Sequence, residues 1–384
     1  MAGLAGQAAI VGIGATEFSK DSGRSELRLA AEASRAALAD AGLEPSDVDG
    51  MVTFTMDGNA EIAVARELGV PELTFFSRIN YGGGAACATV QQAAMAVATG
   101  VAKVVLCYRA FNERSGHRFG QVSMAAAGGL DNAWSYPMGL GTPAADVAMF
   151  ARRYMHEYGA TSEDFGRVAV ADRKHAATNP KAWFYQRPIT LAEHQASRWV
   201  AEPLHLLDCC QESDGAVALV VTSTERARDL PHPPATIAAA AQGSGPDQFV
   251  MTSYYRDGLT GLPEMGTVGR QLWQQAGIGP SDVDVAVLYD HFTPFVLVQL
   301  EELGFCPPGE ARHFIADGTL ELDGRLPLNP HGGQLGEAYI HGMNGIAEAV
   351  RQIRRTSVNQ VPNTRNIVVT AGTGVPTSGL ILTA

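Results

Sequence analysis

The sequence predicts an α/β protein that is built from two similar halves. Its clearest sign is a repeated segment: AGLEPSDVDGMVTF begins at Ala41, and AGIGPSDVDVAVLY begins at Ala276, without a gap. Each copy reads as the end of a helix, a turn and a strand, in the same order. Helices and strands that alternate in this way pack as layers around a sheet. The separation is far longer than a solenoid period, so we expect two pseudo-equivalent units.

Composition places the chain among globular proteins. It has 384 residues, of which 46% are hydrophobic and 18% are charged. The formal net charge of −12 leaves no general basic surface for nucleic acid or an anionic membrane. No apolar run reaches membrane-spanning length, and no Lys or Arg precedes the apolar N-terminal run as in a secretory signal. We therefore expect a cytoplasmic protein.

The first half alternates strands and helices. Residues 8–12 read as a short apolar strand, and residues 26–41 as an alanine-rich helix that Gly42 ends. A second strand is predicted at 51–54, where the first copy of the repeat finishes. These elements give the first unit the helix, turn and strand that the second unit repeats.

A glycine run opens the next helix. The segment NYGGG, residues 80–84, leads into a helical stretch at 85–99 and a buried strand at 102–107. Glycines at a helix N-terminus expose N–H groups that attract an anion, or they only permit a tight turn. Residues 111–185 follow no single period and read as an inserted loop-and-helix region. A strand at 216–221 closes the half.

Proline-rich residues 230–234 mark the boundary between the halves, so we expect one half at 1–230 and the other at 231–384.

The second half contains a glycine-containing polar loop at 328–345, LNPHGGQLGEAYIHGMNG, followed by a helix at 346–353. Glycine lets a ligand approach the main chain closely. A polar loop of this kind is either a site or an ordinary surface loop.

The layout resembles the thiolase superfamily over nearly the whole chain. The shared features are duplicated halves, the glycine-rich helix start, SDGA at 213–216 and an N-x-x-GG loop. Residues 173–180 (RKHAATNP) and 203–216 (PLHLLDCCQESDGA) look more like the lipid-transfer and sterol carrier protein branch. The resemblance implies the five-layered αβαβα thiolase fold, a homodimer and an acyl-CoA ligand.

The departures from thiolases fall on the reactive positions. The nucleophilic cysteine of the family aligns with Gly83, and Cys87 lies a full helical turn further on. Near the place of the second cysteine stands Thr370. The histidine of the family's GHP motif aligns with Tyr339, and the first residue of its NEAF or HDCF motif aligns with Tyr289.

Acyl-enzyme chemistry cannot run without its nucleophile. The pattern instead resembles the actinobacterial aldolases that cleave steroid side chains. That resemblance implies retro-aldol cleavage of a β-hydroxyacyl-CoA steroid, of the 17-hydroxy-3-oxo-pregnene-20-carboxyl-CoA type, to a 17-ketosteroid and propionyl-CoA. It also implies that no metal or other cofactor is used, since CoA is part of the substrate. Members of the group work with a small zinc-ribbon and OB-fold partner, which we expect on each subunit here.

Two tyrosines suit such chemistry, because a phenol is a good acid for an enolate and its phenolate a good base for an alcohol. As a hypothesis, Tyr339 is the base and Tyr289 the acid. A tyrosine base near neutral pH needs its pKa lowered by neighbours, and three histidines lie within sequence reach. The candidate catalytic residues are Tyr289, Tyr339, His331, His291 and His341. The candidate substrate-binding residues are Gly82, Gly83, Gly84, Asp290, Gly332, Gly333 and Gly374.

Several alternatives stay open. The chain could be a non-catalytic lipid or acyl-CoA carrier with a thiolase-like fold, or a thiolase that uses Cys87 as an atypical nucleophile. The place of Cys87 on its helix favours a small packed hydrophobic residue over a nucleophile. Asp290 reads either as an orienting group of the site or as a structural acceptor at a strand end.

Overall fold

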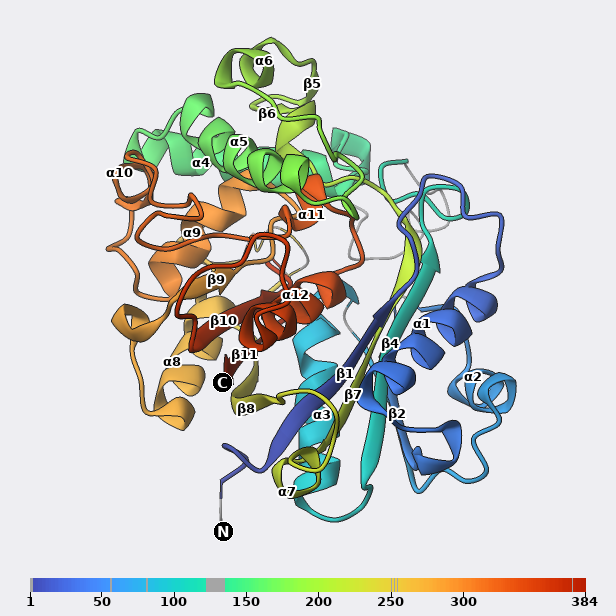
Figure 1. Cartoon of the computed structure of the whole chain (residues 1–384). Coiled ribbons are helices and arrows are strands. Elements are labelled where there is room, and N and C mark those ends of the chain that lie inside the picture. Colours follow the sequence, from blue (N-terminus) through green and yellow to red (C-terminus); the bar gives the residue numbers. More distant parts are fainter. Residues whose placement is uncertain are drawn as a thin grey trace.

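The computed structural model describes residues 3–384 apart from 56, 81, 122–134, 250, 252, 254 and 375. Nine of its described strands form one mixed sheet in the order β3-β2-β4-β7-β1-β8-β11-β10-β9 (Figure 1), and the other two pair with each other in a separate small sheet. The first half contributes β1 (Ala8–Ala15), β2 (Gly50–Phe54), β3 (Phe75–Ile79), β4 (Val104–Asn112) and β7 (Asp214–Ser223). The second half contributes β8 (Ala235–Gly243), β9 (Val285–Val287), β10 (Asn366–Ala371) and β11 (Thr377–Thr383).

The two half-sheets repeat one pattern. In the first half β2 runs parallel to β4, which pairs antiparallel with β7, and β7 pairs antiparallel with β1. In the second half β9 runs parallel to β10, which pairs antiparallel with β11, and β11 with β8. The halves join where β1 and β8 pair at Ala9–Thr236 and Ile10–Ala235. The duplication that the repeated segment predicts is therefore confirmed in the strand order.

Helices complete a five-layered αβαβα arrangement. On the outer side of the first half-sheet lies α1 (Glu26–Ala41), with α2 (Glu61–Leu68) beside it. On the outer side of the second lies α8 (Pro263–Ala276). Between the half-sheets lie α3 (Ala86–Ala98) and α12 (Met343–Arg354), which contact strands of both halves (Figure 1). These two central helices carry the loops that form the site at their N-terminal ends.

The segment between β4 and β7 folds as a separate helical layer. Its described elements are α4 (Pro143–Tyr158), α5 (Ser162–Thr178), α6 (Leu191–Ala196), β5 (Trp199–Ala201) and β6 (Leu204–His205). Helix α5 packs against α9 (Thr293–Glu302) and against α11 (Gly333–Gly336), which lies within the polar loop of the second half. The remaining short helices are α7 (Thr224–Ala227) and α10 (Ala311–Phe314). Part of the predicted insertion, 122–134, lies outside the described residues.

Local signals explain the helix bounds that matter for the site. Helix α1 begins at Ser25, whose hydroxyl accepts a hydrogen bond from the Arg28 N–H, and ends at Gly42, which has a φ of 67°. Helix α12 begins at Met343, earlier than predicted, because Gly342 at a φ of 86° turns the loop into it. In the described part of the chain, no helix combines the length and apolar character needed to cross a membrane.

Candidate active site

Two tyrosine hydroxyls meet at the N-terminal ends of the central helices. Tyr289 follows the end of β9, and Tyr339 lies in the loop between α11 and α12. Their hydroxyl oxygens are 3.0 Å apart, and either can donate the hydrogen bond. The exposed fractions of the two residues are 3% and 8%. The structure therefore brings together the two phenols that the sequence reasoning selected.

Gly83 is in direct contact with this pair. A Cβ atom at Gly83 would lie 2.0 Å from the Tyr289 hydroxyl oxygen and 2.8 Å from its Cζ, far inside normal contact distance. Any side chain at position 83 would therefore overlap the phenol. The Tyr289 hydroxyl thus fills the space beside the position that the resemblance aligns with the thiolase nucleophile. Its neighbours in the run hold the loop: the Gly82 N–H donates to Thr55 Oγ1 at 3.1 Å, and the Gly84 carbonyl accepts from Ser378 Oγ at 2.6 Å.

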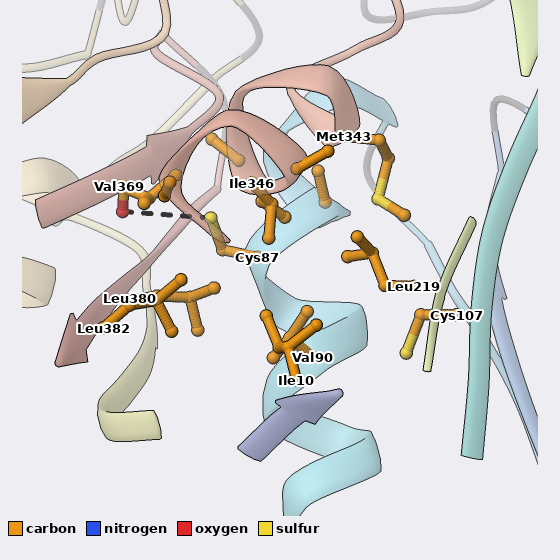
Figure 2. Close-up of a cluster of buried hydrophobic side chains, with 14 of the residues drawn as sticks. Ile10, Cys87, Val90, Cys107, Leu219, Met343, Ile346, Val369, Leu380 and Leu382 are labelled. Carbon is orange, nitrogen blue, oxygen red and sulfur yellow. Dashed lines mark hydrogen bonds between the residues drawn. The ribbon is translucent and has the colours of Figure 1, made fainter. Parts of the chain in front are cut away.

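Cys87 points into the hydrophobic core and not toward the phenols. Figure 2 shows its sulfur among apolar side chains, with Ile346 and Val369 beside it. The residue is fully buried, and its Sγ lies 3.8 Å from the Val369 carbonyl oxygen. Burial raises the pKa of the Cys87 thiol, so a thiolate is disfavoured there. Cys87 is therefore the packed hydrophobic residue among the alternatives that the sequence left open.

Thr370, near the place of the second thiolase cysteine, is a support for the backbone of Tyr289. Its Oγ1 accepts a hydrogen bond from the Tyr289 N–H at 2.9 Å and donates to Gln299 Oε1 at 2.6 Å. The Gln299 side-chain amide also donates to the Tyr289 carbonyl at 2.9 Å. This network fixes the main chain from which the phenol projects.

The three candidate histidines lie at different distances from the phenols. The ring of His341 is 4.4 Å from that of Tyr339, between ring centroids, and the ring of His291 is 4.8 Å from that of Tyr289. His331 is set apart, with Nε2 4.0 Å from Glu337 Oε2. Within the described residues, no hydrogen bond or ring contact joins His331 to either phenol. His291 and His341 are therefore the two imidazoles beside the pair.

The expectation that these histidines lower the pKa of a tyrosine is wrong. Burial lowers the pKa of His291 to about 3 and that of His331 to about 4. Burial and the nearby Arg109 guanidinium lower the pKa of His341 well below its ordinary value. All three imidazoles are neutral near pH 7, so they supply no positive charge. Burial instead raises the pKa of both Tyr289 and Tyr339 well above the ordinary value, and each phenol is protonated in the free protein.

Asp290 is a structural acceptor. Its carboxylate accepts hydrogen bonds from the backbone N–H groups of Gln334 at 2.9 Å and Leu335 at 3.0 Å, at the start of α11. A Cβ at Gly333 would lie 2.1 Å from Asp290 Oδ2, and one at Gly332 would lie 2.5 Å from a neighbouring alanine Cβ on α5. These close approaches require glycine at both positions. The N-x-x-GG loop is thus held in shape by packing and by a helix cap.

Gly374 plays a comparable part in the C-terminal glycine loop. Its φ is 67°, and a Cβ there would lie 2.9 Å from the Met251 carbonyl oxygen. The adjacent Thr373 places its Oγ1 3.2 Å from His291 Nδ1. The loop therefore supports the imidazole that lies beside Tyr289.

One residue beside the site, Arg109, was not among the candidates chosen from the sequence. This residue lies in β4 with no exposed surface, and its Nη2 contacts His341 Nδ1. The signal was present, because a single arginine interrupts the apolar run VVLCYRAF. A charged residue inside a buried strand is rare unless it is paired or functional.

Comparisons with known proteins identify the family of the chain. Residues 8–225 match the family model of the thiolase N-terminal domain, and residues 251–382 match that of the thiolase C-terminal domain-like family. The steroid side-chain-cleaving aldolase of Thermomonospora curvata is 74% identical over 389 residues, covering 100% of both chains. The 17-hydroxy-3-oxo-4-pregnene-20-carboxyl-CoA lyase of Mycobacterium tuberculosis is 73% identical over 384 residues, covering 99% of this chain and 100% of the other.

A solved structure, the Ltp2-ChsH2(DUF35) aldolase, superimposes with a TM-score of 0.96 at 74% identity, covering 100% of this chain and 99% of that one. The two family models together span most of the chain, and the pairing of strands and central helices is the one that the resemblance implied. The chain therefore belongs to the thiolase family, in which it is similar along its whole length to steroid side-chain-cleaving aldolases.

Proposed function

We propose that this chain is an aldol lyase that breaks a carbon–carbon bond in the CoA thioester of a β-hydroxylated steroid side chain. The single observation that carries the proposal is the contact between the Tyr289 and Tyr339 hydroxyls at Gly83, where a thiolase would place its thiol. Identity of 73–74% to aldolases of this kind supports the same reading.

The substrate class follows from the name of the Mycobacterium tuberculosis relative, 17-hydroxy-3-oxo-4-pregnene-20-carboxyl-CoA lyase. In such a substrate the β-hydroxyl sits on a ring carbon without a hydrogen. That carbon cannot be oxidised to a ketone, so thiolysis is not available. Retro-aldol cleavage converts the alcohol to a 17-ketosteroid and releases propionyl-CoA. The hydroxyl proton ends on the former α-carbon, so the reaction balances without an oxidant, a reductant or a metal, and we propose that no cofactor takes part.

In the proposed mechanism, Tyr339 accepts the hydroxyl proton of the substrate and Tyr289 protonates the α-carbon of the thioester enolate. The electron pair of the broken bond passes to the enolate, and the ketone forms at the ring carbon. Both phenols start protonated, because burial raises the pKa of each. The 3.0 Å contact lets Tyr339 pass its own proton to Tyr289 as Tyr289 gives its proton to the α-carbon and Tyr339 takes the proton of the substrate. A relay of this kind avoids a long-lived buried phenolate, which would be costly.

The direct test is incubation of the purified chain with 17-hydroxy-3-oxo-4-pregnene-20-carboxyl-CoA, with mass spectrometry of the products. We expect a 17-ketosteroid and propionyl-CoA in equal amounts. The matched control substrate lacks the 17-hydroxyl and should remain intact, because no proton can then be removed to form the ketone. Release of free CoA by hydrolysis, or binding without turnover in the presence of a small partner protein, would contradict the proposal and favour a carrier.

Replacing Cys87 by alanine should leave the cleavage rate within about threefold of the parent, because the thiol faces the core. The variant should be less stable by about 1 kcal/mol, the usual cost of removing a small buried group. Initial rates and thermal unfolding midpoints measure the two effects. Cys306→Ala, at a half-buried site, is the matched control. A loss of activity of more than about a hundredfold in Cys87→Ala alone would restore the thiolase alternative.

We further propose that the chain forms a homodimer and binds a small zinc-ribbon and OB-fold partner. Support for the partner comes from the Ltp2-ChsH2(DUF35) aldolase structure. Support for the dimer comes from β3, which stands at one end of the sheet. Phe76 on this strand is 63% exposed, and Ile62 on the neighbouring α2 is 71% exposed. Within the described sheet no strand lies beside the outer edge of β3, and such an edge with exposed large hydrophobic side chains is suited to pairing with a second copy.

A further inference from the structure

A buried and loosely paired arginine lies behind the phenols. Arg109 has no exposed surface, and its Nη2 is 3.7 Å from Glu113 Oε2, longer than a hydrogen bond. Its Nε and Nη1 have no hydrogen-bond partner among the residues that the structure describes. Burying an incompletely paired guanidinium costs several kcal/mol. Because its burial is not offset by a full set of hydrogen bonds, Arg109 does not serve stability in an obvious way. Its burial is better explained by a role in the site.

The contact between Arg109 and His341 fixes the tautomer of the imidazole. A guanidinium has only donors, so Nδ1 of His341 must be the acceptor. The proton of this neutral ring then resides on Nε2. Within the described part of the chain, no hydrogen bond engages that nitrogen. His341 therefore keeps an uncommitted N–H group beside the phenols.

The position of the ring directs this N–H toward the site. A Cβ at Gly83 would lie 3.3 Å from His341 Cδ2, the atom bonded to Nε2, and the ring lies 4.4 Å from that of Tyr339. Phe54, Phe111 and Phe119 surround the imidazole with ring centroids at 6.5, 6.5 and 5.8 Å. The aromatic neighbours exclude water from the ring but offer no hydrogen bond in its plane. Its orientation thus depends on Arg109.

The backbone of His341 is also strained. Its φ is 48°, which non-glycine residues seldom adopt, and Gly342 follows at 86°. Such conformations persist where surrounding contacts over-determine them, and they cluster at functional sites. The hydrogen bond from Arg109 is the polar contact that holds this side chain in place.

Charge gives Arg109 a second effect on the pair. The three candidate imidazoles are neutral, whereas a guanidinium is so basic that it stays charged although burial lowers the pKa of Arg109. Its positive charge opposes the burial that raises the pKa of Tyr289, while Glu113 adds to the increase. Asp57 also interacts electrostatically with the guanidinium, and burial raises the pKa of its carboxyl to about 6. The guanidinium of Arg109 thus contacts His341 directly. It interacts electrostatically with Glu113, Asp57 and the two phenols.

We propose that Arg109 is a positioning residue for the cleavage reaction, which holds His341 with its proton on Nε2 and places a positive charge behind the phenol pair. From there the Nε2–H can donate to an oxygen that becomes negative during cleavage. The charge stabilises the phenol that gives up its proton. This inference rests on the proposed lyase function and adds a residue to it.

The test compares Arg109→Met with Arg109→Lys. The methionine variant should lower kcat by about a hundredfold and change KM by less than about threefold, because the lost stabilisation acts in the transition state. Lysine keeps the charge but not the planar fork, so it should recover about a tenth of the parent kcat. If Arg109→Met fails to fold, the double variant Arg109→Met/Glu113→Gln removes both buried charges and takes its place.

Arg354→Met is the matched control. The side chain of this arginine is only 4% exposed, pairs with Asp40 at 2.6 Å and lies at the C-terminal end of α12, away from the phenols. It should lower the thermal unfolding midpoint without lowering kcat. If Arg109→Met lost stability to the same degree and kept its kcat, Arg109 would be structural only and the inference would be overturned.

A second measurement does not depend on turnover. Nitrogen chemical shifts of the imidazoles in histidine-labelled protein report each tautomer, and His341→Gln identifies the signals of His341 among the 10 histidines. In the parent, His341 should show a protonated Nε2 and an unprotonated Nδ1. In Arg109→Met these shifts should move toward a mixture of tautomers. Unchanged shifts would overturn the inference even if the parent chain cleaved no steroid thioester, so the two failures can be told apart.

Discussion

Replacing Tyr339 or Tyr289 by phenylalanine is expected to lower kcat for retro-aldol cleavage by about a thousandfold. Each substitution removes one hydroxyl of the pair that is 3.0 Å apart, and general acid–base catalysis contributes about 10²–10⁴-fold. The rings should stay in place, because they pack against His341 and His291. KM should change little, and steady-state rates with the steroid CoA thioester measure both constants.

The double variant Tyr289→Phe/Tyr339→Phe should be no slower than the slower single variant, because groups that act as one relay lose their effect together. Tyr154→Phe is the matched control, since this buried phenol donates to Glu301 in a different hydrophobic cluster. It should cost about 1–3 kcal/mol of stability and leave kcat unchanged. Cleavage within about tenfold of the parent in either single variant would show that the pair is not the catalytic machinery.

Replacing Gly83 by alanine is expected to abolish at least 99% of the activity, about a hundredfold loss, although only one methyl group is added. Its Cβ would lie 2.0 Å from the Tyr289 hydroxyl oxygen, so the phenol or the start of α3 must move. Either movement breaks the hydroxyl contact with Tyr339. The measurement is kcat together with the thermal unfolding midpoint.

Gly279→Ala is the control for a glycine substitution, because the nearest atom to its Cβ would be 3.9 Å away, in the turn before β9. Adding Tyr289→Phe to Gly83→Ala should recover part of the lost stability, since the overlapping oxygen is gone, but no activity. If Gly83→Ala kept the parent rate, the hydroxyl would not need its present position and the relay would be wrong.

Much of the architecture could be predicted from the chain. The repeated PSDVD segment predicted two equivalent half-sheets. The bounds of α1 follow from the serine that caps its N-terminus and from Gly42 at its C-terminus. Both phenols were chosen by alignment with reactive positions, and the structure brings their hydroxyls together.

The protonation states and contacts of the site residues could not be predicted, because they depend on burial, which the sequence does not reveal. The three histidines were expected to lower the pKa of a tyrosine, but desolvation makes them neutral and raises the pKa of the phenols. Arg109 and His341 are 232 positions apart, so only the fold shows that they touch. Asp290, placed among the candidate ligands of the substrate, uses its oxygens to cap α11.

The overlap between position 83 and the Tyr289 hydroxyl also bears on how such a chain could arise. A side chain at 83 and the present tyrosine at 289 cannot share this space, so the two positions constrain each other. An ancestor with thiol chemistry would have to change both positions nearly together, or pass through an inactive intermediate. Glycine at 83 with tyrosine at 289 should therefore be inherited as a linked pair, and that linkage would distinguish lyases from thiolases in newly determined genomes.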